Sequence, residues 1–307
     1  MTVETAQLAE GVYAYVQHDG GWCVSNAGIL LPPAGSGPRE RPVLVDTAAT
    51  QERARRLRRA LALLSPHDPG LVVNTHFHGD HTFGNAEVAG PGTVIVGHER
   101  TRTEMAQAGL ALTRMWPDAR WGELELVLPG LTYRDALTVH QGDRVIELIH
   151  PGPAHTTNDT LVWLPGERVL FAGDVVLPGC TPFVLMGSVA GMLDAVGLMR
   201  KLDPVTVVGG HGPVAGPAAL DETEGYFRWL WERAEQGVAA GVTPLEAARE
   251  GGPGPYARWR EPERLVANLH RAYAEVRGAE RGVVLDVAAI FAEMVEYNGG
   301  VLPPCHA

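Results

Sequence analysis

The sequence predicts an α/β unit followed by a helical extension, and three observations support this interpretation. Short apolar runs of strand length recur through the first 217 residues. Several of these runs end at a glycine-containing turn that carries a histidine or an aspartate. Beyond Pro217, the apolar residues recur instead at the 3.6-residue spacing of helices. We therefore expect a first domain over residues 1–217 and a helical C-terminal extension over residues 218–307, with ample length to bury a core.

In the first half of the α/β unit, strands are expected to alternate with helices. The expected strands are Gly11–Val16, Ala27–Leu31, Val43–Asp46, Leu71–Val73 and Thr93–Val96. A helix is expected from Thr50 to Leu64, because Ala54, Leu57 and Leu61 would share one apolar face. Its arginines, Arg53 among them, are expected to lie on a solvated face. A second helix is expected from Glu99 to Ala108.

The second half of the unit is expected to contain further strands and one helix, although the sequence shows no detectable repeat. A hairpin is predicted from Ala136–Val139 and Arg144–Ile149, which turn at Gln141-Gly142-Asp143. Strands at Thr160–Leu164 and Arg168–Ala172 follow, then a helix at Val189–Lys201 and a strand that runs up to His211.

The extension is expected to be entirely helical. The predicted helices cover Ala218–Ala239, a segment opened by a capping box from Thr243 to Glu246, Glu261–Arg277 and Asp286–Tyr297, the last two closed by Gly278 and Gly299. Three roles stay open for these helices, which could cover a pocket, build a homodimer interface or buttress the first domain.

The segment from His76 to His81 carries the strongest chemical signal. It places four potential metal ligands, His76, His78, Asp80 and His81, within six residues, directly after the apolar run Leu71–Val73. Imidazole nitrogens and carboxylate oxygens are the ligands that zinc prefers. Side chains two residues apart point to the same side of an extended chain, so the segment can offer two ligands to one metal and two to a second. The alternative interpretation, a histidine-rich surface loop, is disfavoured at this density of ligands.

Three further potential ligands follow in the second half of the unit. His155 lies in a Pro/Gly turn, Asp174 follows a strand-like run, and His211 ends another. Each residue stands where a predicted strand stops, which is where α/β folds place ligand sites.

In this arrangement the chain resembles the metallo-β-lactamase-fold hydrolase superfamily, from about Leu8 to Pro217. The resemblance implies an αββα sandwich with a dinuclear metal site. One metal would be bound by His76, His78 and His155, the other by Asp80, His81 and His211, and Asp174 would bridge the two. Asp46, Thr156 and Asp159 are expected to support the ligands, although Asp46 and Asp159 are equally expected as turn or cap residues.

The resemblance also implies a function. The pair of His81 and Asp174 is similar to that of glyoxalase II and of lactonases, which predicts a zinc-dependent hydrolase of a carboxylic ester, lactone or thioester. Two Zn²⁺ per chain are expected, with iron or manganese as alternatives. The two metals would share a bridging hydroxide as nucleophile, with Asp80 and Asp174 as the catalytic carboxylates. An iron-dependent persulfide dioxygenase and a β-lactam hydrolase are kept as alternative functions.

The walls of a substrate pocket are also suggested by the sequence. Aromatic and sulfur-containing side chains stand in two irregular segments of the unit, namely Met115, Trp116, Trp121, Phe183 and Met186. In this fold such segments can form pocket walls, which would suit an apolar acyl group, although ordinary loop packing explains each residue equally well.

The composition of the chain argues against some classes of binding partner. The formal net charge of −11 argues against a nucleic-acid partner. No apolar stretch is long enough to span a membrane, and the first residues lack the pattern of an export signal. The three cysteines imply neither a disulfide framework nor a Cys-X-X-Cys site. We therefore expect a cytoplasmic enzyme that acts on a small-molecule substrate, with no nucleic-acid or membrane partner and with a homodimer as an open alternative.

Overall fold

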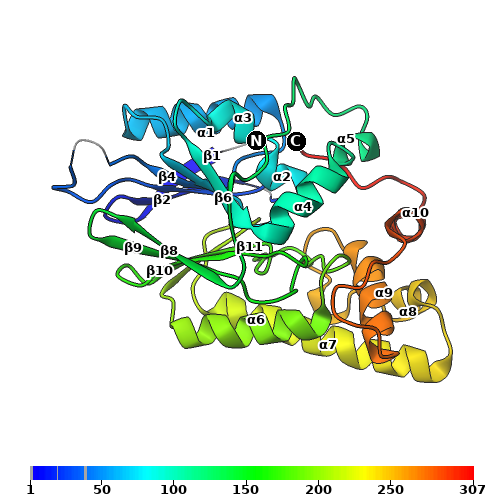
Figure 1. Ribbon diagram of the computed structural model, residues 1–307. Coiled ribbons are helices and arrows are strands. Elements are labelled where there is room, and N and C mark those ends of the chain that lie inside the picture. The colour runs from blue at the N-terminus through cyan, green and yellow to red at the C-terminus, as the bar shows by residue number, and fades with distance from the viewer. Residues whose placement is uncertain (1–2, 19, 38–39) are drawn as a thin grey trace.

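The computed structural model describes residues 3–18, 20–37 and 40–307 and shows two stacked β-sheets between two layers of helices (Figure 1). Helices α1 (Gln51–Leu64) and α3 (Asn85–Val88) lie on the outer side of the first sheet, and α6 (Val189–Leu202) lies on the outer side of the second. This arrangement confirms the predicted αββα sandwich.

The first sheet has seven strands in chain order. They are β1 (Val3–Ala9), β2 (Val12–Gln17), β3 (Ala27–Leu30), β4 (Val43–Val45), β5 (Leu71–Val73), β6 (Val94–His98) and β7 (Leu131–Tyr133). The first four pair antiparallel, and β4 to β7 run parallel to one another. Consequently β4 and β5 end at the same edge of the sheet.

The second sheet has five strands in the order β12-β11-β10-β9-β8. They are β8 (Ala136–Gln141), β9 (Arg144–Ile149), β10 (Leu161–Leu164), β11 (Val169–Gly173) and β12 (Thr206–Gly209). Strands β11 and β12 are parallel, so the residues that follow them also meet at one edge. The other pairs are antiparallel.

Alternation along the strands explains the layering. In β4, Val43 and Val45 face the core between the two sheets, whereas Leu44 faces α1. In β11, Phe171 belongs to the core between the sheets, whereas Leu170 packs with α6. A strand that is apolar on both faces must be covered on both sides, which the four layers achieve.

The remaining helices of the first domain are α2 (Gly79–Thr82), α4 (Glu99–Ala108) and α5 (Leu112–Met115). Those of the extension are α7 (Ala218–Ala240), α8 (Pro244–Gly251), a short 3₁₀ turn (Gly254–Tyr256), α9 (Arg264–Val276) and α10 (Val287–Tyr297). The capping box predicted at Thr243 is present.

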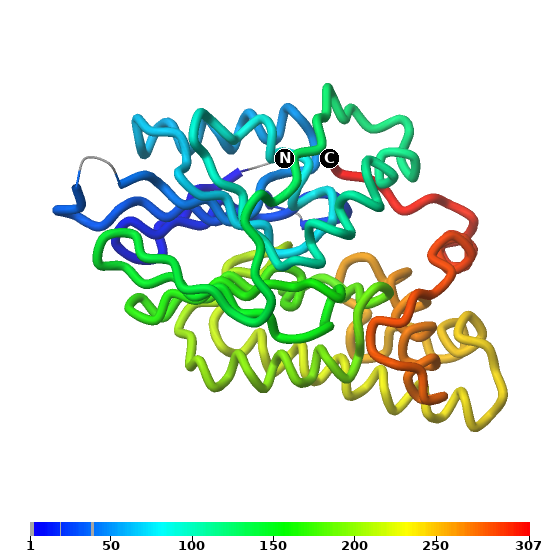
Figure 2. Tube along the Cα trace, viewed as in Figure 1, coloured from blue at the N-terminus to red at the C-terminus, as the bar shows by residue number. Residues whose placement is uncertain are grey.

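The extension shares its core with the second sheet rather than forming a separate one. Leu230 of α7 and Leu269 of α9 belong to the same buried cluster as Leu170 of β11. After α10 the chain returns to the first sheet (Figure 2), where the His306 amide donates to the Trp22 carbonyl oxygen at 3.1 Å. The structure therefore places the extension against the second sheet and its last residues against the first.

The structure differs from the predictions in a few elements. Strand β1 was missed because it mixes polar and apolar residues and none of them is buried, and β7 because two of its three residues are exposed. The helix predicted from Glu261 begins at Arg264. Arg53 was expected on a solvated face, which is wrong, since it is only 9% exposed and donates to the His306 carbonyl oxygen.

Candidate metal centre

All seven predicted ligands lie at the edge of the sandwich where β4, β5, β11 and β12 end. His76 follows β5 and begins the segment that continues into α2, which carries Asp80 and His81. Asp174 and His211 follow β11 and β12. His155 lies in the loop between β9 and β10. Seven side chains that span 136 positions of the sequence therefore converge because parallel strands end together.

The first cluster contains His76, His78, His155 and Asp174, whose ligand atoms lie within 4.8 Å of one another. His78 Nδ1 lies 3.1 Å from His76 Nε2 and 2.9 Å from His155 Nε2. Asp174 Oδ2 lies 3.5 Å from His155 Nε2. Three imidazole nitrogens and one carboxylate oxygen thus face a common point.

The second cluster contains Asp80, His81 and His211. Asp80 Oδ2 lies 3.3 Å from His211 Nε2 and 3.8 Å from His81 Nε2. Asp174 also reaches this cluster, since its Oδ1 lies 3.1 Å from His81 Nε2 and its Oδ2 3.4 Å from His211 Nε2. Asp174 therefore stands between the two clusters, as the bridging role requires.

Hydrogen bonds on the far side of the rings determine which nitrogen faces the clusters. His81 Nδ1 donates to Asp46 Oδ2 at 2.8 Å. The Thr75 hydroxyl donates to the same Asp46 oxygen at 2.6 Å, so it can only accept from His76 Nδ1, 3.1 Å away. His155 Nδ1 donates to the Phe183 carbonyl oxygen. In each of these three rings, when it is neutral, the single proton therefore lies on Nδ1, which leaves Nε2 free to bind a metal.

Hydrogen bonds within the loops hold His211 and His155 in position. The Asn26 amide donates to the carbonyl oxygens of Gly209 and Gly212, at 3.0 and 2.8 Å, on either side of His211. Asp159 accepts from the Thr156 amide at 2.9 Å and from its hydroxyl at 2.7 Å, which closes the loop that carries His155. Asp159 and Thr156 act as turn residues here, whereas Asp46 contacts a predicted ligand directly.

The electrostatics of the two clusters differ. Burial lowers the pKa of His76 well below its usual value and that of His78 to about 3. Burial would do the same to His211, but Asp174 and Asp80 raise its pKa to about 9. Asp174 is buried too, yet His211, His81 and His155 hold its pKa well below the usual range. The imidazoles of the first cluster are thus neutral donors beside the Asp174 carboxylate, and the second cluster attracts positive charge.

The donor set fits a pair of divalent cations. A tetrahedral zinc with ligands at about 2.0–2.1 Å holds neighbouring ligand atoms about 3.4 Å apart, close to the separations found here. Among the described residues, the buried atoms His81 Nε2 and Asp174 Oδ1 have no hydrogen-bond partner although they face each other. Buried polar atoms normally have a partner, and a metal ion would supply it.

A cavity of about 80 Å³ opens onto both clusters. It is lined by His78, Asp80, His155, Asp174 and His211, and by residues of the extension, Arg264, Val287 and Phe291. Of the residues predicted as pocket walls, Met115, Trp116, Phe183 and Met186 line it. Trp121 does not, because it packs against Phe83 with ring centroids 6.3 Å apart. The extension therefore covers part of the cavity.

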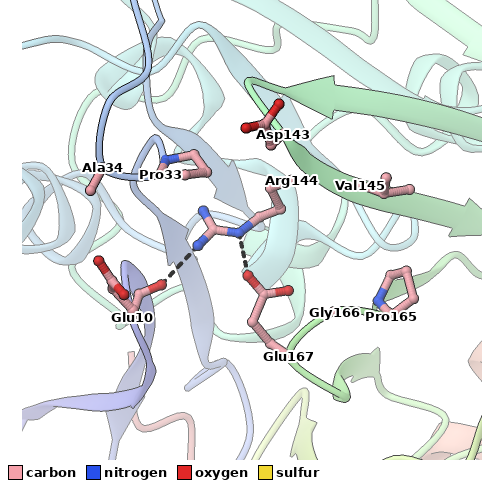
Figure 3. A pocket seen from close by; sticks show the side chains of 9 residues that line it. All are labelled: Glu10, Pro33, Ala34, Asp143, Arg144, Val145, Pro165, Gly166 and Glu167. Carbon is pink, nitrogen blue, oxygen red and sulfur yellow. Dashed lines mark hydrogen bonds and ion pairs between the residues drawn. The ribbon is translucent and has the colours of Figure 1, made fainter.

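A larger hollow of about 520 Å³ lies at the opposite ends of the strands (Figure 3). Its central residue is Arg144, which donates to Glu167 Oε1 at 2.6 Å and to the Glu10 carbonyl oxygen at 2.8 Å. Arg144 joins three turns of the sandwich, and none of the predicted metal ligands lines this hollow. It is therefore a structural feature of the turns and not part of the metal centre.

Sequence reasoning missed several residues of the centre. Thr75 gave no signal beyond its position before His76, although it links that ring to Asp46. Trp22 and Arg264 line the cavity from segments that carry no motif. Only their packing in three dimensions reveals them.

Comparison with known proteins agrees with this geometry. The family model described as the metallo-beta-lactamase superfamily matches residues 20–211. The chain belongs to the metallo-β-lactamase superfamily. The matched range includes all seven predicted ligands and ends at His211.

Relatives of known name match parts of the chain. A 2,4-dinitroanisole O-demethylase subunit alpha from Nocardioides sp. is 34% identical over 45% of this chain and 39% of its own length. A hydroxyacylglutathione hydrolase from Rhodospirillum rubrum is 30% identical over 45% of both chains. A second such hydrolase, from Anaeromyxobacter dehalogenans, is 29% identical over 74% of this chain and 84% of its own. The first two matches thus cover less than half of those relatives.

A solved structure shares the fold. The metallo-beta-lactamase from Pontibacter korlensis superposes with a TM-score of 0.60 at 21% identity, covering 74% of this chain and 99% of its own. In the described part of the chain, no helix has both the length and the apolar character to cross a membrane.

Proposed function

We propose that this protein is a zinc-dependent hydrolase that cleaves a carboxylic ester, a lactone or a thioester. Family membership, the relatives named as hydrolases and the two His/Asp clusters support a metal-dependent hydrolase. The observation that carries the finer proposal is the position of Asp174 between two complete clusters, with its carboxylate oxygens 3.1 and 3.5 Å from His81 and His155.

The roles of the residues follow from their chemistry. His76, His78 and His155 would hold one zinc, Asp80, His81 and His211 the other, and Asp174 both. When bound, such a pair of zinc ions lowers the pKa of water and polarises a carbonyl group. The three neutral imidazoles of the first cluster do not offset the charge of the cation, so only the shared Asp174 carboxylate would reduce what the substrate meets there. Asp80 and Asp174 place negative charge beside His211, and their carboxylates would orient a water molecule held between the two clusters.

Asp46 orients the imidazole rings of His81 and His76. By accepting from His81 Nδ1 and, through Thr75, ordering His76, it holds Nδ1 of each ring in a hydrogen bond and turns both Nε2 atoms toward the clusters. The buried walls formed by Trp22 and Phe183 keep bulk water away from the donors, which strengthens every charge interaction in the site.

The test begins with the metal content of freshly purified protein, measured by elemental mass spectrometry. We expect about two zinc ions per chain and turnover of at least one class in a panel of esters, lactones and thioesters. One iron per chain with oxygen uptake on persulfides would replace this proposal by the dioxygenase. Turnover of β-lactams alone would replace it by the β-lactam hydrolase.

Substituting Asp80→Ala should remove most of the activity and leave the fold intact, because it takes away one of the three protein ligands of the second cluster. Removal of a catalytic group of this kind costs at least about a hundredfold in rate. Asp143→Ala, an exposed aspartate in the β8–β9 turn, is the matched control. An Asp80→Ala protein with an unchanged rate would contradict a two-metal reaction.

The wider setting stays a prediction. A cytoplasmic location, a small-molecule substrate, the absence of nucleic-acid and membrane partners and a homodimer are expectations that rest on the sequence alone.

A further inference from the structure

We propose that the cavity beside the two clusters binds an uncharged aromatic group next to the bond that is cleaved. The inference rests on the proposed function only for the existence of that bond. The binding of the ring is argued from the walls of the cavity.

Four aromatic rings from four separate segments form the walls. Trp22 lies between β2 and β3, Trp116 follows α5, Phe183 follows β11, and Phe291 belongs to α10. Trp22 and Phe183 meet edge to face with centroids 5.3 Å apart, and Trp116 and Phe291 do so at 6.0 Å and 90°. Aromatic rings prefer edge-to-face and offset contacts, so faces and edges of this kind suit a planar ring better than an aliphatic group.

The cavity also limits the size of its ligand. Its volume is about 80 Å³, whereas an apolar cavity of about 150 Å³ accommodates one benzene ring. Met115 and Met186 line the cavity, and methionine is the apolar side chain that adapts most easily to a ligand. A single ring therefore fits only if the two methionines shift.

The charges around the cavity favour an uncharged ligand. Apart from the predicted metal ligands, the polar lining residues are Arg264 and Cys23. Arg264 is 2% exposed, pairs with Glu261 and donates to the Thr181 carbonyl oxygen at 3.0 Å. Its guanidinium carbon lies 4.1 Å from the centroid of the Trp22 ring. Its Nε makes no hydrogen bond, but that atom is inaccessible to solvent.

Cys23 is a buried free thiol and cannot carry a positive charge. Apart from the predicted metal ligands and a metal held by them, no side-chain cation of the described lining is therefore left to pair with a substrate carboxylate. Glutathione thioesters carry two carboxylates, and a buried charge without a partner is costly. The cavity is thus better suited to a neutral aryl ester, aryl thioester or aryl lactone than to a glutathione conjugate.

The test measures binding without hydrolysis. Acetophenone is uncharged, aromatic and not hydrolysable; cyclohexyl methyl ketone lacks the aromatic ring, and 4-acetylbenzoate adds a charge. Titration calorimetry or ligand-observed NMR on the protein as purified should give acetophenone several-fold tighter binding than the cyclohexyl ketone and about tenfold tighter binding than 4-acetylbenzoate. The charged ligand is measured again after chelation, so that a contact between its carboxylate and a metal is recognised.

Two variants locate the site. Phe291→Ala and Leu112→Ala each remove a half-buried wall residue and should weaken acetophenone binding about tenfold and severalfold, respectively. Val284→Ala, at a position that is 90% exposed and outside this cavity, should not change it. The melting temperature of each variant shows that it is folded.

Three results would overturn the inference. The first is that acetophenone does not bind. The second is that the cyclohexyl ketone, or 4-acetylbenzoate after chelation, binds at least as tightly as acetophenone. The third is that acetophenone binds both wall variants as tightly as it binds the wild type. Failure of the proposed reaction is distinguishable from these. It would show as normal acetophenone binding in a protein that turns over no phenyl ester, thioester or lactone with two zinc ions bound.

Discussion

Asp46 and His81 are joined by a hydrogen bond of 2.8 Å from the ring Nδ1 to the carboxylate, and both side chains are almost completely buried. Asp46 follows β4 and His81 belongs to α2, so the bond ties the neighbouring ends of two parallel strands together. Asp46 adopts a positive φ of 58°, a backbone conformation that non-glycine residues adopt rarely and mostly at functional sites. The bond holds Nδ1 of His81 against Asp46 and turns Nε2 toward the clusters.

Substituting Asp46→Asn should weaken the binding of the second zinc by about 10–100-fold, the usual cost of losing a partner behind a metal ligand. Asp46 accepts three hydrogen bonds, from His81 Nδ1, the Thr75 amide and the Thr75 hydroxyl. An amide would present two protons to these donors and could accept only at its single oxygen. The measurement is zinc affinity by competition with a chromogenic chelator, with Asp143→Asn as control. Equal affinities in the two variants would show that the tautomer of His81 does not depend on Asp46.

Gly210 is required by the close approach of Asp174. A Cβ atom at this position would lie 1.9 Å from Asp174 Oδ1, so Gly210→Ala must displace the carboxylate that stands between the clusters. We expect fewer than two zinc ions per chain and the loss of most activity, while the sandwich stays folded. Gly216→Ala, whose new atom would meet nothing closer than 3.9 Å, is the matched control on the same segment. Metal analysis and circular dichroism of both proteins check the expectation, which fails if Gly210→Ala still binds two zinc ions.

The sequence singled out residues that the structure brings together, but it gave little indication of their surroundings, for physical reasons. His76, Asp174 and His211 each follow an apolar run, so their placement depends only on where a buried strand ends. Asp46 also follows a strand, but the sequence pattern of a single aspartate before a helix does not distinguish a residue that caps a turn from one that orients an imidazole. Trp22 and Arg264, which are 242 positions apart, line one cavity through tertiary packing, and no local pattern records such a contact.

The same limit explains the error at Arg53. On helix α1 its position among other arginines predicts solvent exposure, yet the C-terminal residues cover it and accept its hydrogen bond at His306. A helical periodicity reports which face is apolar, but it does not report which polar residue another part of the chain will bury.

The stacked pair of His98 and His150 predicts a loss of stability in mild acid. Their ring centroids lie 4.0 Å apart, and burial together with His150 lowers the pKa of His98 to about 4, against about 6.5 for an unfolded histidine. The folded state thus disfavours the proton, so the stabilisation is complete above about pH 6.5 and is lost as the pH falls toward 4. In metal-free protein, His98→Gln should show a smaller fall in melting temperature between pH 7 and pH 4.5. His67 is exposed, so the melting temperature of His67→Gln should fall as much as that of the wild type. If the melting temperatures of all three proteins fell equally between pH 7 and pH 4.5, the role of the pair would be contradicted.

Removing the extension should destabilise the first domain rather than release it. Leu220, Phe227 and Leu230 of α7 are completely buried in the cluster that also contains Leu170 of the second sheet. A chain that ends at Pro217 would lack these side chains and would expose the apolar surface that they cover, which costs about 25 cal/mol for each Å². We expect it to bind a hydrophobic dye, to associate in size-exclusion chromatography and to melt at a lower temperature. A chain that ends at Gly300 is the matched control, because it keeps every helix and loses only the contacts of the last residues, such as the hydrogen bond from Trp116 Nε1 to Pro303. If the protein ending at Pro217 were monomeric and as active as the whole chain, the extension would contribute neither to the core nor to the cavity wall.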